Sequence, residues 1–148
     1  MRKLAFTLVE LLVVIAIIGI LSLVITFAIQ QTSLNAKLAR KDADLKSILT
    51  AIESKRAENA TILQNITGDW CSACKCVSNG NISQSAGCTL RMQTAYQNLG
   101  FNKIQTDPWG NPYMIDENER ENNLCITHDQ IYSFQHGNPI AVPFYICP

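Results

Sequence analysis

The sequence lacks any excess of charge of one sign. Twelve basic and twelve acidic residues give a formal net charge of zero, and charged residues make up only 16% of the 148-residue chain. A protein that binds a polyanion through its bulk charge carries a clear surplus of Lys and Arg. Composition therefore gives no direct support for nucleic-acid binding, and the length predicts one small domain.

Motifs of catalytic chemistry are also missing. The sequence contains no phosphate-binding glycine loop and no nucleophile elbow. The two histidines, His128 and His136, lie in stretches predicted to be loops, and the carboxylates gather in segments that we expect at the surface. We therefore expect a structural protein and not an enzyme.

Charge is almost absent from the first long segment. Residues 6–29 carry one ionisable group, Glu10, and follow a basic leader, residues 1–5, that contains Arg2 and Lys3. About 20 apolar residues span a bilayer as a helix, whereas the apolar region of a cleaved signal peptide runs about 7–15 residues and ends at a small-residue cleavage site. The pattern predicts one transmembrane helix, with the leader in the cytoplasm and the chain after residue 30 outside.

Glu10 is the exception within this apolar segment. A carboxylate in a membrane helix costs about 2.5–3.5 kcal/mol on insertion scales, so something must compensate for it. The side chain could snorkel to the headgroups, since Glu10 lies four residues from Phe6, or it could have a functional partner. The residues alone leave both explanations open.

Residues 4–21 read LAFTLVELLVVIAIIGIL and resemble the processing and methylation segment of type IV prepilins and pseudopilins. The resemblance implies that a prepilin peptidase cuts between Ala5 and Phe6 and methylates the new amino terminus, and that Glu10 acts in assembly. The chain departs from the family twice: Ala5 stands where Gly is usual, and Phe27 stands where a Pro is common.

The resemblance also implies a function. It is that of a pilin or major pseudopilin, a subunit of a type IV pilus-like or type II secretion filament that assembles through its apolar helix. The implied partners are identical subunits, the peptidase, an inner-membrane assembly platform and minor pilins. Before assembly the chain would be a single-pass cytoplasmic membrane protein, and afterwards part of a cell-surface or periplasmic filament.

Proline and glycine are absent from residues 30–58, so nothing interrupts a helix there. Apolar residues form one helical stripe: Leu34, Leu38, Leu45, Ile48, Leu49 and Ile52. The other face is charged and is expected to be solvated: Lys37, Arg40, Lys41, Asp42, Lys46, Glu53, Lys55, Arg56 and Glu58. We expect an amphipathic helix that continues the membrane segment.

Residues 59–148 are predicted to form an extracytoplasmic globular head, because turn-forming residues cluster there. A short helix is expected at residues 89–99, with Gly100 as its stop. Strands are expected at residues 113–115, 130–134 and 141–146. The fold class is therefore α+β, with a long N-terminal helix packed on a small antiparallel β head that contains disulfides.

All six cysteines lie in this head: Cys71, Cys74, Cys76, Cys88, Cys125 and Cys147. An even number in an oxidising compartment predicts disulfides, for which we favour Cys125 with Cys147 and two bridges among the other four. A zinc site from Cys71, Cys74 or Cys76, and Cys88 is one alternative. A redox-active pair at Cys71 and Cys74 is another, although no helix is expected to follow and lower a thiol pKa.

A second motif predicts a rigid turn that presents a large aromatic side chain, Trp109, to plug a core. Its residues are Asp107, Pro108, Trp109, Gly110, Asn111 and Pro112, followed by Tyr113. The motif resembles the signature of major pseudopilins and related pilins, in which it precedes a small sheet. Residues 131–134 similarly resemble the strand before a loop that often binds calcium in that family.

Calcium ligands cannot be carried over from the family, because residues 135–139 contain no carboxylate. Another group of hard oxygen ligands occurs nearby, at Asp116, Glu117, Glu119 and Asp129. This group is either a solvated acidic turn or a weak calcium site, and no cofactor is required in either case. The alternative to a filament subunit is a membrane-anchored disulfide or metal-binding head that does not polymerise.

Overall fold

The computed structural model describes residues 7–68, 76–78, 81–82, 86–119, 126–134 and 136–146. The chain divides into two compact units, Met1–Leu38 and Ala39–Pro148. The helices are α1 (Leu8–Asn59), α2 (Leu63–Thr67) and α4 (Ala86–Asn98), and the strands are β1 (Val77–Ser78), β2 (Asn81–Ile82), β3 (Tyr113–Asp116), β4 (Gln130–Ser133) and β5 (Ile140–Ala141). The predicted α+β class is confirmed.

Helix α1 joins the two predicted helical segments without a break, as expected for a run that lacks proline. In the second unit Leu45, Ile48 and Ile52 are buried and face the core, so this part of the predicted stripe is confirmed. In the first unit Leu34 and Leu38 remain exposed. The stripe therefore contributes to the core of the second unit only from Leu45 onward.

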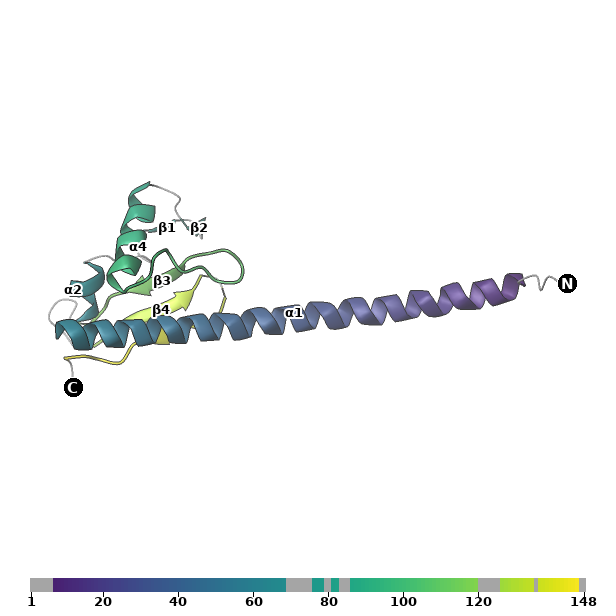
Figure 1. Ribbon diagram of the computed structural model, residues 1–148, viewed down its shortest axis with the longest axis horizontal. Helices are drawn as coiled ribbons and strands as arrows, with labels where there is room; N and C mark the ends of the chain where they lie inside the picture. Colours follow the sequence, from purple (N-terminus) through teal and green to yellow (C-terminus); the bar gives the residue numbers. More distant parts are fainter. Residues whose placement is uncertain are drawn as a thin grey trace. The chain divides into compact units, whose positions relative to one another are not determined.

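A three-stranded antiparallel sheet with the order β3-β4-β5 lies beside α1 in the second unit (Figure 1). Strands β3 and β4 pair from Tyr113 with Ser133 to Asp116 with Gln130, and β4 and β5 pair through Ile131 with Ile140. The short β1 and β2 form a separate hairpin. The sequence analysis predicted strands near β3 and β4 but did not predict this hairpin or α2.

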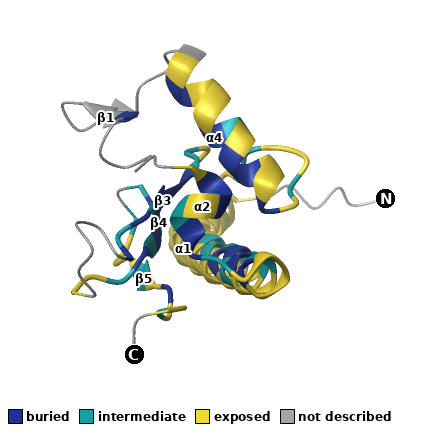
Figure 2. Cartoon of the chain, turned by 90° about the vertical axis from the view of Figure 1, so that its left-hand side faces the viewer, coloured by how far each residue is buried: buried dark blue, intermediate teal, exposed yellow. Residues whose placement is uncertain are grey.

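Alternate residues of the sheet enter two cores. Tyr113 and Ile115 of β3 join Ile131 and the buried face of α1 in the larger core, and Figure 2 shows the buried residues of α1 along one side of that helix. Met114, between Tyr113 and Ile115, instead packs with Met92 of α4. The period of two along a strand explains why neighbouring residues serve different cores.

Helix α4 ends where the sequence predicted. Gly100 has a positive φ of 92°, a conformation that glycine adopts without steric cost. The N–H of Phe101 donates to the Tyr96 carbonyl at 2.9 Å, which satisfies one carbonyl of the last turn. The helix begins at Ala86, three residues before the predicted start.

The predicted strand at residues 141–146 is wrong in most of its length. Strand β5 ends at Ala141, and Pro143, which has no N–H, follows two residues later. The N–H groups of Tyr145 and Ile146 donate to a side chain, the Glu119 carboxylate, at 2.8 Å each. The C-terminal segment is therefore held by side-chain contacts and not by a sheet ladder.

Candidate functional site

Helix α1 opens with a capping box formed by Thr7 and Glu10. The Thr7 hydroxyl accepts the Glu10 N–H at 3.2 Å, and the Glu10 carboxylate accepts the Thr7 N–H at 2.8 Å and the Thr7 hydroxyl at 2.7 Å. Reciprocal bonds of this kind satisfy the otherwise unpaired donors at a helix start. The carboxylate therefore has a local partner three residues away.

This arrangement was not predicted from the sequence, although its signal is present there. A Thr followed three residues later by Glu, before an apolar run, is the signature of a capping box. The predicted processing residues, Ala5 and Phe6, lie outside the described residues. The capping box uses atoms of Thr7 and Glu10 only, so removal of residues 1–5 would leave all of its atoms in place.

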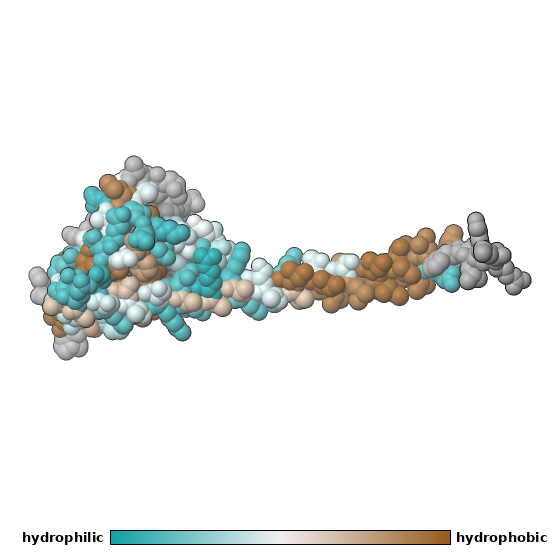
Figure 3. Space-filling view, viewed as in Figure 1, coloured by the Kyte–Doolittle hydropathy of each residue, from teal (hydrophilic) through white to brown (hydrophobic). Residues whose placement is uncertain are grey.

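The first unit exposes a nearly continuous apolar surface, seen as the brown part of α1 in Figure 3. This helix is long and apolar enough to cross a membrane. Three of its hydroxyl groups, those of Ser22, Thr26 and Thr32, each donate at 2.8 Å to the carbonyl four residues earlier. Such back-bonding gives these three donors a partner within the helix itself, which suits an apolar environment.

The second motif forms the predicted rigid turn. One oxygen of Asp107 accepts the N–H groups of Trp109 and Asn111, and the other accepts the Ser133 hydroxyl at 2.6 Å. Gly110 has a positive φ of 92°, and Thr106 bridges to Pro112 across the base of the turn. Asp107, which is buried, therefore ties the turn to strand β4.

Trp109 does not plug a core, and that prediction is wrong. Trp109 is only half-buried, and its ring stacks on His136 at a centroid distance of 3.7 Å. It belongs to neither core cluster. The tight turn places the indole against the loop that contains His136, and the larger core is filled by other aromatic residues, among them Tyr96 and Tyr113.

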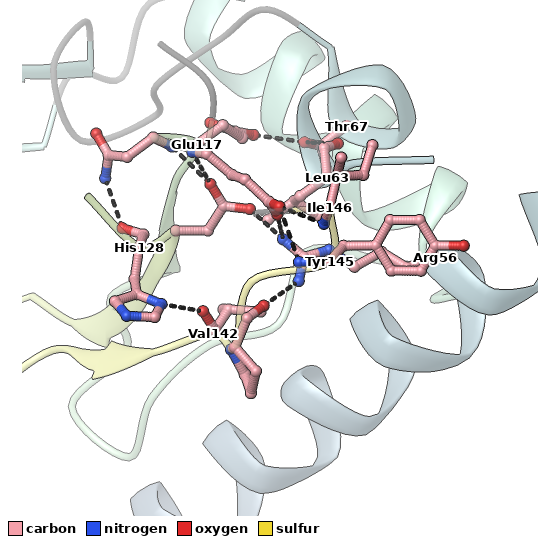
Figure 4. A network of polar contacts seen from close by, with 12 residues as sticks. Arg56, Leu63, Thr67, Glu117, His128, Val142, Tyr145 and Ile146 are labelled. Atoms are coloured by element: carbon pink, nitrogen blue, oxygen red, sulfur yellow. Dashed lines mark hydrogen bonds and ion pairs between the residues drawn. The ribbon is translucent and has the colours of Figure 1, made fainter. Parts of the chain in front are cut away.

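A buried polar network joins distant segments of the head (Figure 4). Arg56, which was expected on the solvated face of α1, is only 3% exposed. Its guanidinium forms ion pairs with Glu119, at 3.0 Å, and with Asp129, and it donates to the Pro143 carbonyl at 2.6 Å. The predicted solvated position of Arg56 is wrong, because helical periodicity does not reveal which partners the rest of the chain supplies.

Asp129 is the centre of this network. Its other carboxylate oxygen accepts the N–H groups of Asn118 and Glu119, both at 2.6 Å. Burial raises the pKa of Asp129, while these two N–H groups and the Arg56 guanidinium act in the opposite direction. Asp129 thus closes the turn after β3 with one carboxylate oxygen and contacts Arg56 of α1 with the other.

Glu117 lies at the edge of the network and has a different environment. One carboxylate oxygen contacts the Thr67 hydroxyl at 2.5 Å, while Oε2 has no hydrogen-bond partner among the described residues. Burial raises its pKa to about 8, although the Thr67 bond lowers it and the nearby Asp129 raises it further. Glu117 is therefore mostly protonated at neutral pH in the folded head.

The four predicted calcium ligands are thus brought to one region but not to one shared site. Glu119 and Asp129 face Arg56, Glu117 faces Thr67, and Asp116 closes the pairing of β3 with β4. Among the described residues, no group of three or more His, Cys, Asp or Glu side chains is arranged to hold a metal ion. Calcium binding stays an untested prediction.

One disulfide is described, between Cys76 and Cys88. It packs against Met92 and Met114 in the smaller core. This bridge agrees with the expected pairing among the first four cysteines, and both of the described cysteines are in it. The other four, Cys71, Cys74, Cys125 and Cys147, lie outside the described residues, as does the alternative redox pair of Cys71 and Cys74. The alternative zinc site needed the Cys88 thiolate, which the disulfide with Cys76 occupies.

Comparison with known proteins identifies the N-terminal segment. The model of the prokaryotic N-terminal methylation motif matches residues 1–26. No curated protein and no solved structure matches the chain. The matched segment contains the expected cleavage position after Ala5, the capping box and the first part of the apolar helix. The N-terminus is that of a prepilin-like substrate of type IV pilus or secretion systems.

Proposed function

We propose that this protein is a structural subunit, a pilin or major pseudopilin, of a type IV pilus-like or type II secretion filament. The observation that carries the proposal is the methylation motif at residues 1–26, which includes the start of an apolar helix whose side chains in the first unit are exposed. An exposed apolar surface of this length needs either lipid or other protein to cover it. A membrane covers it before assembly, and identical helices cover it afterwards.

Prepilin peptidase cuts between Ala5 and Phe6 in this proposal and methylates the new amino terminus of Phe6. The precursor spans the cytoplasmic membrane with its leader inside, and the head folds outside, where its cysteines oxidise. An inner-membrane platform and minor pilins then act in assembly. The filament contains the apolar helices at its centre and the heads at its surface.

Glu10 pairs in the filament with the positively charged amino terminus of Phe6 on a neighbouring subunit, and this pairing sets the axial register. The capping box supports the proposal, because Thr7 orients the Glu10 carboxylate at the end of the helix where that amino terminus lies. Both Thr7 donors contact the same oxygen, Oε2. A charged donor would therefore add to the box without replacing it.

Two measurements test this function. Mass spectrometry of material sheared from the native cell surface is expected to find a chain that starts at Phe6 and carries an N-methyl group. Glu10→Ala should insert into the membrane normally but lose at least about tenfold in filament yield, since a charge left unpaired at low dielectric costs roughly 3–5 kcal/mol. Glu10→Gln, similar in size and uncharged, tests the charge separately from the shape.

The alternative, an anchored head that does not polymerise, predicts different results from the same experiments. The chain would keep Met1 or never appear in sheared filaments, and Glu10→Ala would have no phenotype beyond the helix start. A normal filament yield from Glu10→Ala would reject the pairing of Glu10 with Phe6. An intact Met1 terminus in assembled filaments would reject processing at this position.

A further inference from the structure

We propose that Arg56 is the built-in counter-ion of the head and takes the place of a divalent cation at its acidic cluster. The residues involved are called the Arg56 clamp: Arg56 on α1, the carboxylates Glu119 and Asp129, and the C-terminal segment 143–146 (Figure 4). The inference concerns the head alone and does not depend on filament assembly.

Occupancy of the carboxylate oxygens is the first argument. Both oxygens of Asp129 are engaged, one by Arg56 and the other by the N–H groups of Asn118 and Glu119. Both oxygens of Glu119 are engaged as well, one by Arg56 at 3.0 Å and the other by Tyr145 and Ile146 at 2.8 Å each. An incoming cation would therefore have to displace N–H donors from these oxygens.

Charge is the second argument. Two carboxylates only 1–2% exposed face a guanidinium that is itself 3% exposed. Buried carboxylates require a cation or a set of hydrogen-bond donors, and the clamp supplies both from the chain. A divalent ion placed beside the guanidinium would meet a like charge in a region of low dielectric, where repulsion is strong.

Topology is the third argument. The clamp joins Arg56 to partners that are 63, 73 and 87 residues away, at Glu119, Asp129 and Pro143. A metal ion in an extracellular loop has the same structural effect, because it ties together segments that are far apart in sequence. Here side chains of the protein itself connect the C-terminal segment to the end of α1.

The test measures thermal unfolding of the full-length chain in detergent micelles by tryptophan fluorescence, with disulfides intact. Each sample is measured either with about 5 mM calcium chloride or with a chelator, at matched ionic strength. This calcium concentration fills even weak extracellular sites. The variants are Arg56→Met, which keeps most of the volume without the charge, and Arg40→Met as a matched control. Arg40 lies on the same helix, and its side chain is 62% exposed.

The wild type is expected to unfold at the same temperature in both solutions. Arg56→Met should unfold on the order of 10 °C lower in chelator and recover part of that loss as calcium is added, since its carboxylates then lack a counter-ion. Arg40→Met should behave as the wild type. If Arg56→Met does not fold, Arg56→Lys is measured instead. This variant keeps one positive charge, and its stability should lie between those of the wild type and Arg56→Met.

Three results would overturn the proposal. A saturable rise of the wild-type midpoint with calcium would make the cluster a calcium site. An Arg56→Met chain as stable as Arg40→Met would remove any role for the guanidinium. A destabilised Arg56→Met chain with no response to calcium would reduce Arg56 to packing and hydrogen bonding, because a lost counter-ion should be replaceable by another cation.

Discussion

Helix α1 carries one notable charge in each of the two units, and the two are satisfied in opposite ways. Glu10, in the first unit, is bound by Thr7, three residues away. Arg56, in the second unit, is bound by Glu119, Asp129 and Pro143. The first solution is complete within one helical turn, whereas the second requires most of the chain.

The difference follows from what surrounds each charge. In the first unit the Glu10 carboxylate and the hydroxyl groups of Ser22, Thr26 and Thr32 bond within about one helical turn, so these groups keep their partners whatever covers the outside of the helix. A head in water can use distant partners instead, because folding brings them together once. Long-range partners give a single arrangement of the chain, and their loss is correspondingly costly.

The largest expected effect is the loss of a long-range partner. Asp129→Ala should destabilise the head by about 3–5 kcal/mol, because it leaves Arg56 without one of its two carboxylates and leaves the N–H groups of Asn118 and Glu119 without their acceptor. Urea unfolding of the full-length chain, followed by tryptophan fluorescence, measures the change. Asp42→Ala is the control: the Asp42 side chain is 62% exposed, and its ion pair with Lys41 should contribute only about 0–1 kcal/mol. Equal losses of stability from Asp129→Ala and Asp42→Ala would mean that the long-range partner of Arg56 contributes no more than the ion pair of Asp42.

Local signals in the sequence predicted much of the fold. The long helix, the stop at Gly100 and the strands near β3 and β4 depend on periodicity and on breaker residues, which act within a few positions. The capping box of Thr7 and Glu10 was equally local, and its pattern was present in the sequence. For these elements, propensity and tertiary structure agree.

Long-range features could not be predicted in the same way. Arg56 occupies a helical position that suits a solvated residue, and only the folded chain places Glu119 and Asp129 beside it. The same reason explains the error at the end of the predicted strand, where the N–H groups of Tyr145 and Ile146 donate to the Glu119 side chain instead of a neighbouring strand. Trp109 was misplaced because a turn motif specifies backbone conformation and not the surface that its aromatic ring contacts.

The disulfide is the next largest constraint between distant residues. Replacing both Cys76 and Cys88 with Ser opens a loop of 12 residues, and for a loop of about this length the chain-entropy model predicts a loss of about 3 kcal/mol. Urea unfolding under non-reducing conditions measures the loss, with mass spectrometry to confirm that the remaining cysteines have not changed partners. Adding reductant should lower the urea midpoint of the wild type at least as far as the two substitutions do. The same reductant should change the midpoint of the variant by a smaller amount. An unchanged midpoint would show that the smaller core holds without this bridge.

Glu117 predicts a pH dependence that separates it from the ion pairs. Its pKa is about 8 in the folded head and 4.5 in the unfolded chain. Below pH 4.5 both states are protonated, and the stabilising effect of the neutral acid is fully present. Between pH 4.5 and 8 only the unfolded chain releases the proton, so stability falls as pH rises, by at most about 1.4 kcal/mol per unit.

Glu117→Gln keeps the uncharged shape, so it should lose this slope while keeping the bond to Thr67. Urea unfolding at several pH values between 4.5 and 8 compares the two chains. The free energy of unfolding of the wild type should be close to that of the variant at pH 4.5 and should fall below it as pH rises. Parallel curves for the two chains would mean that Glu117 is already ionised in the folded head at neutral pH.

The smallest expected effect tests the local side of the comparison. Thr7→Val keeps the shape of the side chain but removes the hydroxyl that accepts the Glu10 N–H and donates to its carboxylate. Losing such a cap costs about 1 kcal/mol, so amide exchange at Glu10 in micelles should speed up by about fivefold. Thr7→Ser keeps the hydroxyl and should exchange like the wild type. In a Glu10→Ala background Thr7→Val should have a smaller effect than in the wild type, because the bonds from Thr7 to the carboxylate are already lost and only the bond from the residue-10 N–H to the Thr7 hydroxyl remains to be removed. Independent effects of the two substitutions would mean that Thr7 and Glu10 do not act as one unit, and the charge in the apolar helix would then need a partner from outside its own turn.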